Sequence, residues 1–174
     1  RLVEDVADGC ELQVPKKWLW RGRHVRLVDG TTVSMPDTQA NQEAYPQPSA
    51  QQKGVGFPLA RLVVMLSLAT AMVSGYQMGP YSGKETGETA LLRQLFDHFS
   101  PGDVALVDRY FCGWFMIALQ RQRGVDTVTR QHQLRTTDFR RGQRLGPGDH
   151  LVYWPKPARP AWMDQATYDG LPVW

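Results

Sequence analysis

Two short apolar runs of this chain each carry an aspartate. Asp29 lies inside the run at residues 25–33, and Asp108 directly follows the run at residues 104–107. Short apolar runs bounded by turn-forming residues predict buried β-strands. A carboxylate buried on a core strand is costly unless a cation or hydrogen-bond donors compensate it. Two such acids on neighbouring strands therefore indicate a positive partner between them, and a divalent metal ion is the obvious candidate.

The bulk composition places the chain among soluble globular proteins. Its 174 residues suffice for one domain, or for one domain and part of another. The apolar share of 42% and the charged share of 21% are typical of that class. The two cysteines, Cys10 and Cys112, lie far apart and favour neither a zinc site nor a disulfide framework. The chain begins at Arg1 and not at methionine, so we expect a piece of a larger protein.

Positive charge is concentrated in the second part of the chain. Residues 1–108 carry ten basic and twelve acidic side chains, a net charge of −2, whereas residues 109–174 carry ten and five, a net of +5. Most of the basic residues in the second part are arginines, whose planar guanidinium group suits phosphate oxygens. An anionic partner is expected to bind there, and a solvated basic face is an equally good explanation.

Hydrophobic periodicity predicts a mixed order of strands and helices. Strands are expected at about residues 24–35, 61–70, 71–81, 104–107 and 125–129. A helix is expected to carry the apolar stripe of residues 91–99, with Ser82 or Thr86 as the cap at its start, and a second helix at about 113–123. A helix stays possible for residues 62–71, because short apolar runs are ambiguous. Residues 36–58 hold almost no large apolar side chain and predict a long, disordered loop. Residues from 131 onward predict an irregular, β-rich segment.

This order of elements is the order expected for a ribonuclease-H-like nuclease core. In such a core the first acid lies within one strand and the second ends a neighbouring strand, where divalent metals bridge them on a phosphodiester. Magnesium takes few carboxylates and completes its shell with water and substrate oxygens. Simpler explanations stay open at this point. Asp29 and Gly30 are typical of a hairpin turn, and Asp108 with Arg109 is typical of a surface ion pair.

Several separated motifs carry a more specific resemblance. They are DGTTVSMPDT at residues 29–38, YPQ at 45–47, GVGFP at 54–58, GPYSGKETGE at 79–88, GDVALVDRYF at 102–111, DFRRG at 138–142 and WPKP at 154–157. In this order the motifs resemble the DDE-class insertion-sequence transposases of the IS-four family. The resemblance spans the chain from about Trp20 to its C-terminus.

The resemblance implies an α/β fold, with a ribonuclease-H-like core of mixed sheet and flanking helices. The core enters a β-rich insertion and is truncated before the final helix. Residues 1–23 would then be a connecting segment, residues 24–130 the partial catalytic core, and residues 131–174 the start of the insertion. Asp29 and Asp108 would be catalytic acids and metal ligands. The third acid, a glutamate on a helix after the insertion, has no counterpart, so the fragment is expected to be inactive alone.

The same resemblance implies a cofactor and partners. The cofactor would be Mg²⁺ or Mn²⁺, with two ions in the complete enzyme, and the partner would be double-stranded DNA, as transposon ends and as target. In such enzymes the metal ions activate first water and then a DNA 3′-hydroxyl for attack on a phosphorus atom of the DNA backbone. These reactions excise the mobile element and join it to the target DNA. The complete protein would be a bacterial, cytoplasmic protein associated with the nucleoid and not with a membrane, and a dimer on paired ends.

Six residues are candidates for DNA contact: Lys84, Arg109, Arg130, Arg140, Arg141 and Trp154. Each has a simpler explanation as well. Lys84 lies in a Gly-rich turn where it more readily faces solvent, and Arg109 serves equally well as the partner of a nearby acid. Trp154 has basic neighbours and is able to stack on a base, or it packs within β-structure. The alternative function for the whole chain is a non-catalytic, DNA-binding remnant of a decayed mobile element.

Overall fold

The computed structural model of the protein describes residues 2–52 and 54–173, so Arg1 and Trp174 lie outside the described residues. The elements follow one another as α1 (Leu2–Glu11), the 3-10 helix η1 (Lys16–Trp18), β1 (Val25–Ser34), α2 (Gln39–Ala44), β2 (Leu59–Ser67), β3 (Val73–Pro80), α3 (Glu88–Gln94), η2 (Phe96–His98), β4 (Val104–Val107), η3 (Arg109–Phe111), α4 (Trp114–Gln122), β5 (Asp126–Thr129), β6 (Gln143–Gly146), β7 (Asp149–Leu151) and α5 (Gln165–Asp169). None of the helices in the described ranges is long and apolar enough to cross a membrane.

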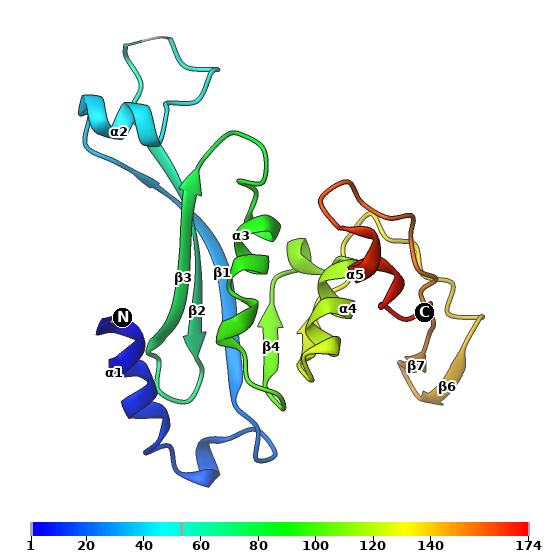
Figure 1. The fold of residues 1–174 in the computed structure, drawn as a ribbon. Coiled ribbons are helices and arrows are strands. Elements are labelled where there is room, and N and C mark those ends of the chain that lie inside the picture. Colours follow the sequence, from blue (N-terminus) through cyan, green and yellow to red (C-terminus); the bar gives the residue numbers. More distant parts are fainter. Residues whose placement is uncertain (1, 53, 174) are drawn as a thin grey trace.

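The central strand, β1, belongs to a five-stranded mixed sheet with the order β3-β2-β1-β4-β5 (Figure 1). β2 pairs antiparallel with both β1 and β3, whereas β4 runs parallel to β1 and β5 runs parallel to β4. The helices α3 and α4 supply the crossovers that parallel strands require. This arrangement confirms the predicted mixed α/β class and is compatible with a ribonuclease-H-like core.

The apolar core lies between the sheet and the helices α3 and α4. Alternation along the strands turns Val28 of β1 and Val107 of β4 toward this layer, where they are 1% and 6% exposed. They share one cluster with Leu92 of α3 and Leu119 of α4. The leucine spacing predicted for α3 is therefore confirmed, although the helix begins at Glu88 and has no side-chain cap.

The opposite face of the sheet is open over much of its area. Leu27 of β1, Tyr76 of β3 and Val128 of β5 point to that face and expose between 36% and 51% of their surface. Apolar residues line a groove there, namely Trp20, Val25, Leu68, Val104, Leu106 and Val128. The expectation that all apolar residues of β1 are buried is therefore wrong for Leu27, because only one face of the strand is covered.

Arg26 is a buried arginine near the start of β1. Its guanidinium pairs with Asp103, which precedes β4, at 3.3 Å, and with Glu11, at the end of α1, at 3.1 Å. Asp103 also accepts the backbone N–H of Ser100 at 3.0 Å. These contacts join α1, which the sequence patterns do not predict, to the end of the sheet at which β1 and β4 begin.

A second ionic contact at this end of the sheet makes the fold sensitive to acid. The Asp126 carboxylate accepts a hydrogen bond from Arg23 at 2.8 Å and also pairs with Arg121. The hydrogen bond from Arg23 is the largest cause that lowers the Asp126 pKa from its ordinary value of 3.8. A carboxylate with a lowered pKa stabilises the fold fully above the unfolded-state pKa, and this stabilisation is lost as the pH falls through the folded-state pKa.

We therefore expect Asp126→Asn to be less stable than wild type at neutral pH and to lose less stability below about pH 4. Urea unfolding at a series of pH values measures both effects. Asp97→Asn is the matched control, because the Asp97 side chain is 92% exposed and lies 3.7 Å from its partner Arg123. An acid profile of Asp126→Asn that is parallel to the wild-type profile would contradict this role.

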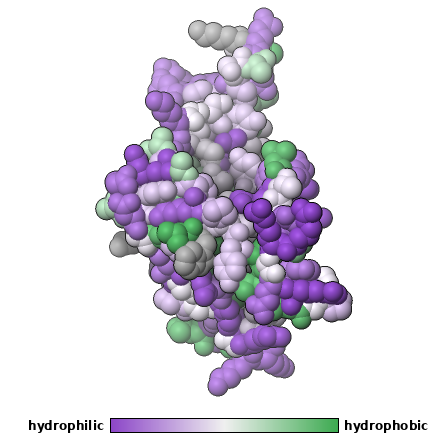
Figure 2. Space-filling view, turned by 90° about the vertical axis from the view of Figure 1, so that its right-hand side faces the viewer, coloured by the Kyte–Doolittle hydropathy of each residue, from purple (hydrophilic) through white to green (hydrophobic). Residues whose placement is uncertain are grey.

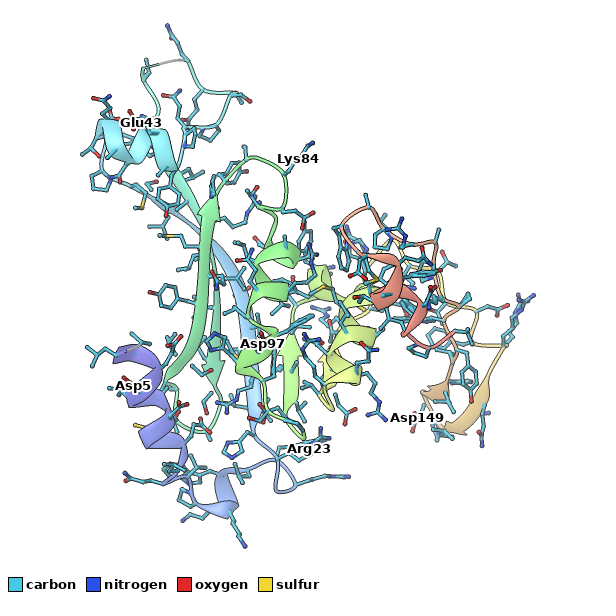
Figure 3. The ribbon with its side chains drawn as sticks, viewed as in Figure 1. Asp5, Arg23, Glu43, Lys84, Asp97 and Asp149 are labelled. Atoms are coloured by element: carbon cyan, nitrogen blue, oxygen red, sulfur yellow. The ribbon has the colours of Figure 1, made fainter. Side chains whose placement is uncertain are left out.

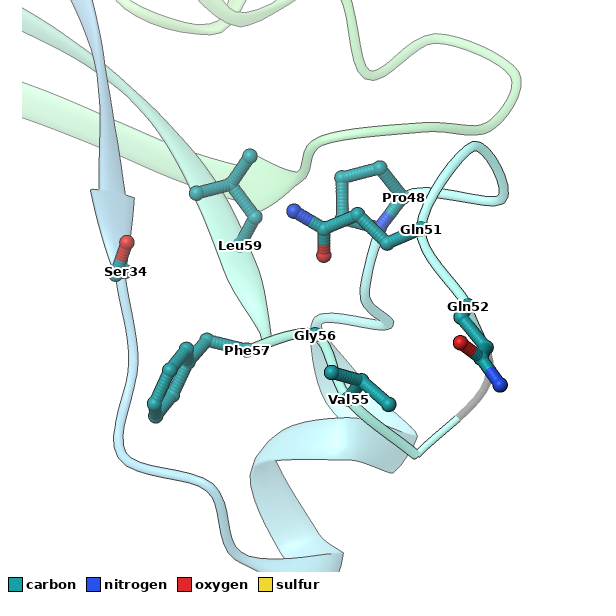
Figure 4. Close-up of a pocket in the computed structure, with 8 residues that line it drawn as sticks. All are labelled: Ser34, Pro48, Gln51, Gln52, Val55, Gly56, Phe57 and Leu59. Carbon is teal, nitrogen blue, oxygen red and sulfur yellow. The ribbon is translucent and has the colours of Figure 1, made fainter.

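Residues 36–52 and 54–58 belong to a folded extension between β1 and β2, and the expectation of disorder is wrong for these described residues. The extension contains α2 and projects beyond the sheet (Figure 1). Amide side chains supply several of its hydrogen bonds, since Gln42 donates both to Asp37 at 2.8 Å and to the Gly56 carbonyl at 3.2 Å. A pocket opens where the extension meets β2, with Phe57 at its wall (Figure 4). Apolar periodicity did not reveal this order because polar contacts maintain it.

Residues 131–173 form the β6–β7 hairpin and α5, joined by irregular segments. The last part of this region packs on the core. Met163 and Leu171 belong to the apolar cluster, and the Trp114 indole N–H donates to the Trp154 carbonyl at 2.9 Å. Figure 2 shows the side of the molecule to which this region belongs, with a mainly hydrophilic surface and hydrophobic residues in small separate groups.

Candidate metal and DNA site

The parallel pairing of β1 with β4 places the two predicted acids next to one another. Val28 pairs with Val107, the last residue of β4, so the following residues, Asp29 and Asp108, are neighbours across the strands. Val28 and Val107 both point into the core, and the side chains that follow them turn to the opposite side because strands alternate. Both aspartates are exposed. Alternation therefore turns Asp29 to the open face of the sheet, and Asp108 follows in the neighbouring position, directly after β4.

The expectation that these acids are buried is wrong. The Asp29 carboxylate accepts the backbone N–H of Gly30 at 2.8 Å. The backbone around Asp108 is anchored, since its carbonyl accepts the Thr129 hydroxyl at 3.2 Å. Within the described part of the chain, no basic side chain pairs with either carboxylate. The case for a metal therefore depends on two adjacent, uncompensated negative charges and not on the cost of burial.

Neither of the simpler explanations for these acids agrees with the structure. Asp29 and Gly30 lie within β1, where they pair with β2, and do not form a hairpin turn. Arg109 does not pair with Asp108, because its guanidinium donates to the Gln133 side chain at 3.3 Å. The adjacent carboxylates consequently have no structural role that the described contacts explain.

The two aspartates fit the donor set of a hard divalent cation. Mg²⁺ and Mn²⁺ prefer carboxylate oxygens, and Mg²⁺ keeps several positions for water and phosphate oxygens. Asp29 and Asp108 are the residues that would hold such an ion. Among residues 2–52 and 54–173, no group of three or more His, Cys, Asp or Glu side chains forms a complete metal site. The described residues therefore include two neighbouring acids and no complete metal site.

Three predicted DNA-contact residues lie at the same end of the sheet as the two acids. Lys84 follows β3, Arg109 follows β4 and Arg130 follows β5, and these three strands run in the same direction. All three side chains are exposed, and Figure 3 shows Lys84 in the turn between β3 and α3. The topology thus assembles positive charge around the ends of the parallel strands.

Arg140 and Arg141 lie elsewhere, in the loop ahead of β6. Arg140 binds both oxygens of Asp138, at 2.8 and 3.0 Å, and Arg141 lies 3.9 Å from the same carboxylate. The hydrogen bonds from Arg140 lower the pKa of Asp138. Since the two arginine side chains are about 90% exposed, these ion pairs are weak and a phosphate is able to replace Asp138.

Trp154 is part of the packed structure rather than a free stacking surface. The ring is partly buried against the core, and the guanidinium group of Arg135 lies 3.9 Å from its centroid. A base that stacks on this covered face has to displace Arg135. The ring is thus a DNA contact only after a local rearrangement.

A mixed sheet of this order, with two acids on neighbouring strands, is compatible with a ribonuclease-H-like domain. The family model described as "Transposase DDE domain" matches residues 20–160. This match covers most of the chain, and the chain belongs to the DDE transposase family, which acts in DNA transposition and generally uses divalent metals. Comparisons with curated proteins and with solved structures gave no match. The predicted DDE class is confirmed, and the narrower IS-four assignment stays a prediction.

Proposed function

We propose that this chain is the catalytic-core part of an insertion-sequence transposase of the IS-four family. The adjacency of Asp29 and Asp108 supports this proposal most directly. A divalent ion held there supplies Lewis-acid activation of the attacking oxygen and offsets the charge of the phosphate. Mg²⁺ or Mn²⁺ is the proposed cofactor, with two ions in the complete enzyme. Residues 24–130 are then the core, residues 1–23 a connecting segment, and residues 131–174 the start of the insertion.

The chain contributes binding and orientation through its own residues. Asp29 and Asp108 hold the cation on an exposed face that a DNA backbone is able to reach. Lys84, Arg109 and Arg130 are exposed after β3, β4 and β5 and would contact phosphates of transposon ends or target DNA. Arg140, Arg141 and Trp154 extend the proposed interface into the insertion. In the complete protein, we propose a dimer on paired DNA ends in the bacterial cytoplasm, at the nucleoid.

The third acid of the family pattern is absent from the sequence after Asp108, where only isolated aspartates occur. We therefore propose that the chain binds metal and DNA without completing strand transfer by itself. The alternative is a non-catalytic DNA-binding remnant of a decayed mobile element. The net charge of +5 in residues 109–174 supports DNA binding under both proposals.

The two proposals differ in the effect of divalent ions on DNA affinity. In the metal-dependent enzyme, two carboxylates repel the phosphate until an ion binds between them, so low concentrations of Mn²⁺ are expected to raise affinity for a DNA duplex. In a binding remnant, Mn²⁺ only competes with arginines for phosphates and is expected to lower affinity. Fluorescence anisotropy of a labelled duplex, at constant ionic strength, measures the direction of the change.

The aspartate variants sharpen this test. Asp29→Asn is expected to abolish the rise with Mn²⁺ and to keep the steep salt dependence of binding, because the basic residues set that dependence. Asp37→Asn, which removes an exposed acid of the extension, is the matched control and is expected to behave as wild type. A wild-type affinity that Mn²⁺ only lowers would contradict the metal-dependent function, and an affinity that salt does not change would contradict both proposals.

A further inference from the structure

The turn that carries Lys84, at residues 81–87 between β3 and α3, contains a strained residue. Glu85 has a φ of 56°, which lies in the left-handed region. A residue with a β-carbon adopts this region only where its surroundings compensate the cost, whereas glycine adopts it freely. A contact with the remainder of the fold is therefore expected to hold Glu85 in this conformation.

Arg93, in the last turn of α3, supplies this contact. Its guanidinium pairs with the Glu85 carboxylate and also donates to the Thr89 carbonyl at 3.4 Å. The Arg93 side chain is only 16% exposed. Burial lowers the pKa of Arg93 from its ordinary value of 12.5, and the Glu85 carboxylate opposes this change. The ion pair therefore compensates a half-buried charge and holds the strained turn at the same time.

An aromatic ring fixes the Arg93 guanidinium in place. The guanidinium lies 3.9 Å from the ring centroid of Trp162, which belongs to the segment after the β6–β7 hairpin. Trp162 in turn makes an edge-to-face contact with Phe115 of α4, at 6.1 Å between the ring centroids. A cation over an aromatic face is attracted by the ring electrons. Arg93 therefore cannot simply follow Glu85 if the turn moves away from the helix.

A second arginine attaches the same turn to the sheet. Arg61, on β2, donates to the carbonyl of Thr86 at 3.0 Å, and Thr86 donates to the Gly83 carbonyl at 3.1 Å. Both arginines thus bind the base of the turn and leave Lys84 exposed at its tip (Figure 3). Within residues 2–52 and 54–173, no carboxylate pairs with the Lys84 ammonium group. The turn is fixed while its only lysine is free to meet an anion.

We propose that Arg93 is a positioning residue for DNA binding, which acts through Glu85 to hold the strained turn that presents Lys84 to a phosphate. This inference rests on the proposed function, in which Lys84 contacts DNA, and it adds a residue that touches no DNA itself. A lysine on a mobile turn binds phosphate less well, because the turn has to become ordered when the DNA binds. A turn that is already held in the free protein avoids that loss.

The salt dependence of DNA affinity measures the contact at Lys84 separately from the stability of the fold. Each phosphate contact adds about 0.9 to the slope of the logarithm of affinity against the logarithm of salt concentration. Lys84→Met is therefore expected to reduce this slope by about 1, as measured by fluorescence anisotropy of a labelled DNA duplex. Arg93→Met is expected to reduce the slope by a similar amount, and the double variant is expected to lose little more.

Arg123→Met is the matched control for Arg93→Met. The Arg123 guanidinium also lies over an aromatic ring, 5.2 Å from the centroid of Phe96, and lies 3.7 Å from the Asp97 carboxylate. It follows α4 at the end of the sheet where β5 begins, whereas Lys84 lies at the end where β3 and β5 end. Its loss removes an equal charge and is expected to leave the salt slope at the wild-type value.

Two substitutions of Glu85 test whether the conformation of the turn is the cause. Glu85→Ala and Glu85→Gly both remove the carboxylate that Arg93 binds, so they change the charge equally. Only glycine adopts the positive φ of this position freely. Glu85→Gly is therefore expected to keep the wild-type slope, also in combination with Arg93→Met, whereas Glu85→Ala is expected to lose about 1. Circular dichroism of each variant checks that the fold is retained.

The outcomes separate this inference from the function on which it rests. If Lys84→Met lowers the slope while Arg93→Met keeps it, the role of Arg93 is overturned and the proposed function stands. The same conclusion follows if Lys84→Met keeps the wild-type slope, or if the two Glu85 variants have equal slopes. An equal loss in Arg123→Met also overturns the role of Arg93, since general charge then explains the effect. If the wild-type affinity does not depend on salt, the proposed function itself fails, and this inference fails with it.

Discussion

Asparagine in place of Asp29 or Asp108 is expected to lower the affinity of the protein for Mn²⁺ by at least about 100-fold. The reason is a comparison with residues that only hydrogen-bond to a metal ligand, since their loss already lowers metal affinity by about 10- to 100-fold. Asparagine preserves the shape of the side chain and removes its negative charge. The two carboxylates are adjacent across β1 and β4, and no basic side chain of the described residues competes with a metal for them. The variants thus remove a ligand and leave the fold intact.

The double variant distinguishes one shared site from two separate sites. If a single ion needs both carboxylates, Asp29→Asn combined with Asp108→Asn is expected to lose little beyond either single change, which is strong non-additivity. Isothermal titration calorimetry measures the affinities. Asp97→Asn is the control, since its side chain is 92% exposed and lies in η2, away from the sheet end in question. Two independent, additive losses would rule out a shared ion.

Removal of the Arg26 side chain is expected to cost about 3–5 kcal/mol of folding free energy, because the buried carboxylates of Glu11 and Asp103 lose the cation that they share. The side chains of Arg26, Glu11 and Asp103 are only 10%, 11% and 4% exposed. Arg26→Met retains much of the apolar stem and removes the charge. Urea-induced unfolding, followed by circular dichroism, gives the change in the free energy of unfolding.

A second change tests whether uncompensated charge causes this loss. Adding Glu11→Gln to Arg26→Met is expected to restore part of the stability, because the buried negative charge at Glu11 is then removed. Arg144→Met is the control. Arg144 is exposed and only its weak contact with the Gly146 carbonyl, at 3.4 Å, is lost, so a change within about 0.5 kcal/mol is expected. A comparable loss in both single variants would contradict the role of the buried network.

Apolar patterning was sufficient for the strands and helices of the sheet and its crossovers. The runs that contain Val28 and Val107 predicted β1 and β4, and the leucine spacing around Leu92 predicted α3. These predictions succeeded because burial on one face imposes a local period on the sequence. Patterning failed for residues 36–52 and 54–58, whose order depends on polar contacts such as those of Gln42. It also did not reveal α1, which buries Ala7.

The candidate site was predicted in part. The sequence indicated that Asp29 and Asp108 lie on neighbouring strands, and the structure brings them together. It also indicated that both acids are buried, which is wrong because the strands expose the face that carries them.

By itself, the sequence determined the strands of the main sheet and the two helices that connect them, where the two acids occur along the strands, and where basic charge is concentrated. These are local properties of side chains and of the backbone period. Only the tertiary structure decided that Val28 pairs with Val107, that one face of β1 is open, and that Leu92 of α3 packs in one cluster with Val28. Strand register and helix-to-sheet contacts join segments distant along the chain, so packing of the whole domain sets them and no local pattern does.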